Sequence, residues 1–133
     1  MDASRPYAPH LDGLSILLYS VVQMEPLTLG EFEQVVLLAI LRLDDNAYGV
    51  TIREEIAACT ERNPSPGALY TTLDRLEERG LVDSKFGDPT PQRGGRAKRF
   101  FTVTRSGLQA VARVQRGYQR LLKGVALPGV SHA

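Results

Sequence analysis

The pattern of hydrophobic and polar positions predicts a first helix that ends at residue 43. In the segment GEFEQVVLLAILRL, residues 30–43, apolar side chains fall three and four positions apart, as they do along the buried face of a helix. Leu37 and Leu41 lie outside this stripe, so the helix is apolar over a wider arc than one core requires. The two leucines therefore predict a second buried contact, which we assign to a dimer interface.

A second, shorter helix is predicted over about residues 50–60. Its spacing places Ile52, Ile56 and Cys59 on the inward side and charged residues on the outer side. The helix is expected to stop before Pro64, because the residue that precedes a proline is disfavoured in the α region.

The third predicted helix has the clearest boundaries. Ser65 is suited to cap its first turn, Pro66 to take the first helical position, and Gly80 to end it in the left-handed conformation. The inward stripe consists of Leu69, Thr72, Leu73 and Leu76. The free side consists of Gly67, Tyr70, Thr71, Asp74 and Arg75.

After Gly80 the spacing of hydrophobic positions shifts towards two, which is typical of β-strands. The segments LVDSKF, residues 81–86, and AKRFFTVT, residues 97–104, are separated by a run rich in glycine and proline. This pattern predicts an antiparallel hairpin with a long tip.

The last predicted helix starts after Thr104, which is suited to cap it. Its apolar positions follow the a/d spacing of a coiled-coil seam, with a glutamine at one position. The seam residues that we assign to a dimer interface are Leu108, Val111, Gln115, Tyr118 and Leu122.

The order of helix, helix, helix, hairpin and helix predicts a mainly α fold with a small β-hairpin. This is a winged helix-turn-helix plus a C-terminal dimerisation helix, in which the third helix enters the major groove of DNA and the hairpin is the wing. We expect the winged-helix DNA-binding domain over residues 27–104 and the dimerisation helix over residues 105–126. Residues 1–26 are expected to form an N-terminal extension, flexible or partly helical, and residues 127–133 a frayed tail.

Charge is divided unevenly along the chain. The net charge of the 133 residues is +1, yet residues 1–92 carry 7 Lys and Arg against 15 Asp and Glu, and residues 93–133 carry 9 Lys and Arg and no acid. This division predicts an anionic partner for the C-terminal third, with nucleic acid the first candidate and an acidic membrane surface the second. The alternative is a basic helix that pairs with acidic helices of the same fold.

The composition favours a cytoplasmic protein. The only cysteine is Cys59, so no intramolecular disulfide forms and a reducing compartment is expected. The longest apolar run, residues 14–22, is far shorter than the ~20 residues that span a bilayer, so we expect no membrane insertion.

Catalysis finds little support in the sequence. The two histidines, His10 and His132, lie near the ends of the chain, and Cys59 has no ligand-spaced partner. No phosphate-binding or dinucleotide-binding motif occurs. We therefore expect no enzyme activity, no metal and no cofactor.

The start of the third predicted helix has the chemistry of a DNA contact. A helix N-terminus carries free N–H groups and partial positive charge, and the small residues Ser65 and Gly67 let a phosphate approach them. Tyr70 and Thr71 offer hydroxyls, and Arg75 offers a guanidinium. The alternative is that the small residues only start the helix and that Tyr70 packs on a neighbour.

The hairpin tip combines cations with flexible glycines, which suits contact with the DNA backbone or the minor groove. The residues concerned are Arg93, Gly94, Gly95, Arg96, Lys98 and Arg99. The alternative is a solvated turn with incidental charges. Glu77 and Glu78, on the preceding helix, are expected to point away from DNA.

Several segments together resemble the PadR family of bacterial transcription regulators. They are LTLGEFEQVVLLAILRL, AYGVTIREEI, SPGALYTTLDRLEERGLV and GDPTPQRGGRAKRFFTVTRSG, and they cover about residues 27–110. The single short helix after the wing is similar to the smaller branch of this family.

The resemblance implies a homodimeric winged-helix repressor that binds an inverted-repeat operator in double-stranded DNA and is often released by a small-molecule effector. The family's DNA contacts fall on Ser65, Gly67, Tyr70 and Thr71, and its wing on Gly94, Gly95, Arg96 and Lys98. The alternative from another class is a winged-helix protein-interaction module that does not bind DNA, whose basic C-terminal third binds an acidic protein.

Overall fold

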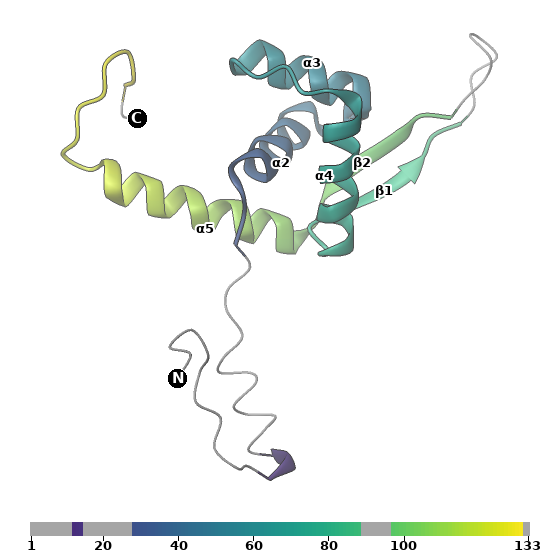
Figure 1. Cartoon of the computed structure of the whole chain (residues 1–133), viewed down its shortest axis with the longest axis horizontal. Coiled ribbons are helices and arrows are strands. Elements are labelled where there is room, and N and C mark those ends of the chain that lie inside the picture. Colours follow the sequence, from purple (N-terminus) through teal and green to yellow (C-terminus); the bar gives the residue numbers. More distant parts are fainter. Residues whose placement is uncertain (1–11, 15–27, 89–96, 132–133) are drawn as a thin grey trace, which may run out of the picture.

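The structure, a computed structural model, describes residues 12–14, 28–88 and 97–131, and its elements follow the predicted order (Figure 1). They are helix α2 (Glu31–Leu43), the 3-10 turn η1 (Asp44–Asn46), α3 (Gly49–Cys59), α4 (Pro66–Glu78), strands β1 (Val82–Phe86) and β2 (Arg99–Val103), and α5 (Arg105–Leu122). The prediction of a mainly α winged helix with a hairpin is confirmed. Most of the expected N-terminal extension and the hairpin tip, with Arg93, Gly94, Gly95 and Arg96, lie outside the described residues.

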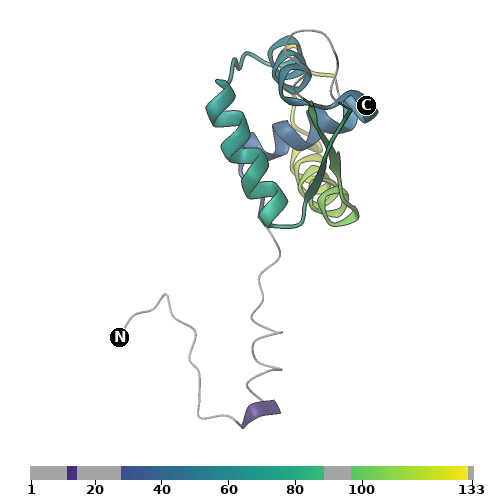
Figure 2. The same cartoon turned by 90° about the vertical axis from the view of Figure 1, so that its right-hand side faces the viewer.

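Helix α2 lies at the centre of the fold and contacts α3, α4, β2 and α5. Each of these elements contributes apolar side chains to one continuous core. Figure 2 shows α2 between α4 on one side and α5 on the other. The largest fully buried side chains include Ile40, Ile52, Leu73, Leu81 and Phe101. The core therefore fixes both the helix and the hairpin that were predicted to meet DNA.

Of the two leucines of α2 that the sequence assigns to a partner surface, one is exposed and the other is buried. Leu37 is 0% exposed in the core of the protomer, whereas Leu38 and Leu41 are each 38% exposed. The assignment of Leu37 to a dimer interface is wrong, because the elements around α2 cover most of its wide apolar arc. Leu38 takes its place beside Leu41 as exposed apolar surface.

Helix α3 packs on the core through Ile52 and Ile56, both buried as predicted. Cys59 is exposed, contrary to the prediction, and its thiol donates a hydrogen bond to Oε1 of Glu55 at 3.3 Å. The helix ends at Cys59, so this residue lies beyond the part of α3 that faces the core.

Helix α4 begins and ends as predicted. The Ser65 hydroxyl accepts a hydrogen bond from the N–H of Ala68 at 3.1 Å, and Pro66 is the first helical residue. Gly80 has a φ of +73°, a left-handed conformation that glycine adopts without steric cost. The predicted inward residues Leu69, Thr72, Leu73 and Leu76 are all buried.

Strands β1 and β2 form the predicted antiparallel hairpin, with Val82 opposite Val103 and Phe86 opposite Arg99. The Phe101 N–H donates to the carbonyl of Ala47 at 2.8 Å, and Tyr48 forms an isolated bridge with Phe100. These bonds attach the middle of β2 to the residues just before α3, and the hairpin projects away from the helices (Figure 1).

Helix α5 is held to the core only by its first turns. The Thr104 hydroxyl accepts from the N–H of Gly107 at 3.1 Å and donates to the carbonyl of Gly80 at 2.6 Å. The buried residues of α5 are Gly107, Ala110 and Val111, and its second half extends beyond the other helices (Figure 1).

The predicted seam of α5 is divided between core and surface. Val111 is 5% exposed and packs in the protomer core, which corrects its assignment to a dimer interface. Leu108 and Tyr118 are 47% and 48% exposed, and Gln115 and Leu122 are half-buried. The other four seam residues therefore remain available for contact with a partner.

Candidate nucleic-acid interface

One face of α4 is exposed along the whole helix. The structure brings together on it the five residues that the sequence predicts, and all are exposed: Ser65, Gly67, Tyr70, Thr71 and Arg75. The first turn contains no acidic side chain, so the partial positive charge of the helix N-terminus is uncompensated there. This face has free backbone N–H groups, hydroxyls and a guanidinium, which are the groups that bind phosphates and base edges.

Tyr70 is seated on Gly49, the first residue of α3. A Cβ atom at position 49 would lie 2.1 Å from Oη of Tyr70 and 2.8 Å from its Cζ, so only glycine permits this contact. Tyr70 nevertheless stays 40% exposed. The ring packs on a neighbour, as the alternative interpretation predicts, and the residue also remains open to a ligand.

Lys98 lies immediately before β2, at the end of the paired strands that is nearer the hairpin tip, and it is exposed. Its Nζ lies 4.4 Å from the ring centroid of Tyr48 and 3.3 Å from the Tyr48 hydroxyl, to which it donates a hydrogen bond. The Tyr48 ring in turn meets Phe100 edge-on, with centroids 5.5 Å apart. An ammonium has three donors, so Lys98 retains hydrogen-bonding capacity for a phosphate while Tyr48 orients it.

Tyr48, which is half-buried, and Gly49, which is buried, support the exposed residues Lys98 and Tyr70, although the sequence did not predict them as site residues. The segment DDNAYG reads as a turn between helices and carries no signal for a ligand. Only the fold shows that these two residues lie under Lys98 and Tyr70.

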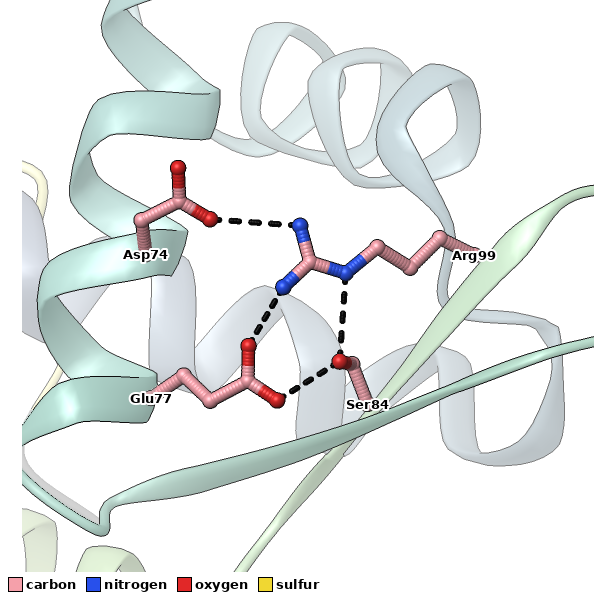
Figure 3. A network of polar contacts seen from close by, with 4 residues as sticks. All are labelled: Asp74, Glu77, Ser84 and Arg99. Atoms are coloured by element: carbon pink, nitrogen blue, oxygen red, sulfur yellow. Dashed lines mark hydrogen bonds and ion pairs between the residues drawn. The ribbon is translucent and has the colours of Figure 1, made fainter.

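Arg99 does not belong to the free cations of the wing, which corrects the sequence interpretation. Its Nε donates to Oγ of Ser84 at 3.1 Å, and its terminal nitrogens donate to Oδ1 of Asp74 at 3.2 Å and to Oε2 of Glu77 (Figure 3). The guanidinium also lies over the ring of Phe101, 4.9 Å from its centroid. Its donors are therefore directed at the protein itself.

Glu77 is held in its charged form by the same network. The Ser84 hydroxyl donates a hydrogen bond to Oε1 of Glu77 at 2.6 Å. This bond, opposed by partial burial and reinforced by the charge of Arg99, lowers the pKa of Glu77 below its ordinary value. Glu77 thus turns its carboxylate towards the hairpin strands.

The cations of α5 are exposed. Among residues 12–14, 28–88 and 97–131, no ion pair joins α5 to another element. The exposed cations concerned are Arg105, Arg113, Arg116, Arg120 and Lys123. The interpretation of α5 as a basic helix paired with acidic helices of its own chain therefore receives no support from the described part of the molecule.

The described ranges contain no cluster of three His, Cys, Asp or Glu side chains arranged to bind a metal. In the same ranges, none of the helices combines the length and apolar character needed to cross a membrane.

The family of the chain follows from its sequence. Residues 37–113 match the model of the transcriptional regulator PadR-like family. The chain belongs to this family. PadR-like proteins are transcriptional regulators rather than enzymes, and PadR regulators bind DNA.

Relatives and solved structures agree with the PadR assignment. The chain is 36% identical over 91 residues to Transcriptional regulator Rv3488 of Mycobacterium tuberculosis, covering 67% of this chain and 78% of that protein. Its fold is similar to that of a PadR family transcription regulator from Clostridium difficile, with a TM-score of 0.55, 22% identity and coverage of 71% of this chain and 93% of the other. A transcriptional regulator from Clostridium thermocellum gives a TM-score of 0.56, 19% identity and coverage of 70% and 87%.

Proposed function

We propose that this PadR regulator binds an inverted-repeat operator in double-stranded DNA as a homodimer and represses transcription. In this proposal α4 enters the major groove and the hairpin follows the phosphate backbone. The observation that carries the proposal is the free face of α4, where Gly67, Tyr70, Thr71 and Arg75 are exposed together above a fully buried opposite face.

The roles of these groups differ. The acid-free N-terminus of α4 and Lys98 are suited to phosphates, which fix the register of the protein on the duplex. The Thr71 hydroxyl and the Arg75 guanidinium are suited to base edges, which carry the sequence. From the sequence alone, Arg93, Gly94, Gly95 and Arg96 are assigned to the wing contact.

A second copy of the chain is the natural partner for the apolar surface of α5 and α2. Leu108, Tyr118 and Leu121 of α5 are exposed, and so are Leu38 and Leu41 of α2, which contacts α5. Pairing of these surfaces across a twofold axis would present two α4 helices to one side of a duplex. Two half-sites would then lie about 34 Å apart, one turn of DNA.

Repression and release by a small effector are proposed from the family resemblance. A reporter gene placed behind the selected operator tests repression. Expression that rises when this protein is produced would contradict a repressor.

Selection of bound duplexes from a random pool tests the proposed function. We expect the recovered sequences to contain an inverted repeat with half-sites about one helical turn apart, bound by two chains per duplex in a sedimentation experiment. A scrambled duplex of the same length is the control. Equal affinity for every duplex would contradict operator recognition, and no binding at low salt would favour a protein-interaction module.

A further inference from the structure

We propose that Arg99 is a positioning residue for DNA binding, which holds the hairpin on α4 and neutralises two acids of α4 without touching DNA itself. This inference rests on the proposed function, because it concerns how the same surface is assembled. The inference gives Arg99 a different role from that of Lys98, the exposed residue that precedes it.

The contacts of Arg99 join three elements. The residue belongs to β2, its acceptors Asp74 and Glu77 belong to α4, and Ser84 belongs to β1 (Figure 3). Ser84 also donates to Glu77, so the four side chains form a closed set of hydrogen bonds rather than a single surface ion pair. A planar guanidinium with a fixed fork of donors suits three acceptors in different directions.

The charges explain why this network matters for DNA. Asp74 lies on the exposed face of α4, one turn beyond Tyr70, and Glu77 follows one turn later. Two free carboxylates at these positions would repel the phosphates that flank a major groove. Arg99 places its positive charge directly against both of them.

The geometry also fixes an orientation. The hairpin must meet the backbone while α4 lies in the groove, so the angle between these elements decides whether both contacts form at once. Arg99 of β2 bonds to Asp74 and Glu77 of α4. Ser84 of β1 bonds to the carboxylate of Glu77 as well. Loss of the network would allow the hairpin to rotate relative to α4.

Lys98 provides a matched control, because it is a cation that precedes Arg99 directly in the sequence. Successive side chains of an extended strand point to opposite faces, and here Lys98 is exposed next to Tyr48 while Arg99 is half-buried against α4. We therefore assign a phosphate contact to Lys98 and a contact within the protein to Arg99.

The test compares the salt dependence of operator binding for the wild type, Arg99→Ala, Arg99→Lys, Ser84→Ala and Lys98→Ala. Each phosphate contact contributes about 0.9 to the slope of log affinity against log salt, so Lys98→Ala should make the slope of a dimer shallower by about 1.8. Arg99→Ala should weaken binding about tenfold, because the hairpin is no longer held on α4. Adding Lys98→Ala to Arg99→Ala should then change the affinity and the slope little further, because the phosphate contact of the displaced hairpin is already impaired.

Thermal unfolding monitored by circular dichroism shows whether each variant is folded. If Arg99→Ala does not fold, the two milder variants keep the test valid. Arg99→Lys keeps the charge but not the fork of donors, so it should recover little of the lost affinity. Ser84→Ala removes one neutral hydroxyl and should weaken binding about threefold, and this effect should disappear in an Arg99→Ala background.

Three results would overturn the inference. Additive losses of affinity for Arg99→Ala and Lys98→Ala, or full recovery by Arg99→Lys, would show that Arg99 meets a phosphate itself. Wild-type affinity in both Arg99→Ala and Ser84→Ala would show that the network does not position the hairpin, and the proposed function would stand. A wild-type protein that binds no duplex would overturn the proposed function and this inference with it.

Discussion

Helices α4 and α5 each have a buried face and a free face, but the two free faces differ in kind. Helix α4 packs on the core from Leu69 to Leu76, and its free face is polar. Helix α5 packs on the core only up to Val111. Its free surface mixes exposed apolar residues such as Leu121, 76% exposed, with cations that form no ion pair among the described residues.

This difference indicates two kinds of partner. The free face of α4 is exposed and polar, so it suits a hydrated, charged ligand such as DNA. The exposed apolar residues of α5 are costly to leave in water, and we propose that a second copy of the chain, which offers the same surface, covers them. The predictions below change one helix or the other.

The largest effect is expected from charges placed on the α5 surface. The double variant Leu108→Glu and Tyr118→Glu should be monomeric, because glutamates would be buried without partners in a twofold interface. Loss of the dimer should weaken operator binding by about 100-fold or more, since a second half-site no longer binds intramolecularly. Analytical ultracentrifugation and fluorescence anisotropy measure the two effects.

Val50→Glu is the control for oligomeric state, because Val50 is an exposed apolar residue of α3. It should leave the dimer intact. A dimer that persists in the α5 double variant would show that the chain associates through another surface.

Truncation of a side chain should lower stability on the buried face of α4 and change sequence preference on its exposed face. Leu73→Ala removes a fully buried side chain and should lower the free energy of unfolding by about 2–5 kcal/mol. Thr71→Ala changes the exposed face and should alter stability by less than about 0.5 kcal/mol, while it changes the preference between operator sequences. Urea unfolding and competition binding separate the two results, and a Thr71→Ala protein with unaltered sequence preference would contradict the base-reading role.

A smaller effect is expected at the seat of Tyr70. Gly49→Ala should displace the exposed phenol rather than the core, so the protein should stay folded and operator affinity should fall roughly three- to tenfold. In a Tyr70→Ala background, Gly49→Ala should have no further effect on affinity. An equal loss in both backgrounds would mean that Gly49 acts by letting DNA approach α3 directly.

The smallest effect concerns acid stability. Because the pKa of Glu77 is lowered in the folded protein, its contribution is complete above the ordinary value of 4.5 and is lost as the pH falls through the lowered pKa. Glu77→Gln should therefore make unfolding less dependent on pH below about 4.5. Glu55 contributes in the same direction, because hydrogen bonds from Arg42 and Cys59 lower its pKa.

Glu78→Gln is the control, since Glu78 is an exposed carboxylate next to Glu77 on the same helix. Chemical unfolding at a series of pH values gives the comparison. Identical pH profiles for the wild type and Glu77→Gln would show that the network does not favour the charged carboxylate.

Local signals in the sequence were enough to predict α4 and the hairpin. Ser65, Pro66 and Gly80 act within a few residues of the helix ends, and each does so as the residue type dictates. The alternation in β2 is equally local. For this reason the fold and the residues on the free face of α4 follow from the sequence alone.

Features set by distant parts of the chain did not follow. Leu37 is buried and Cys59 exposed because of where neighbouring elements begin and end, which periodicity within one helix does not contain. Arg99 reaches acids 22 and 25 residues away, and in sequence it reads only as one more cation of a basic run. The different surroundings of Lys98 and Arg99 are therefore visible only in the structure.

The most direct test of the account is the affinity of the wild-type protein for a duplex carrying the selected inverted repeat, measured between about 50 and 200 mM salt. If each subunit of a dimer meets three to five phosphates, log affinity should fall against log salt with a slope of roughly −5 to −9. An affinity that does not change with salt would contradict the claim that the face of α4 and the hairpin bind the phosphate backbone of DNA.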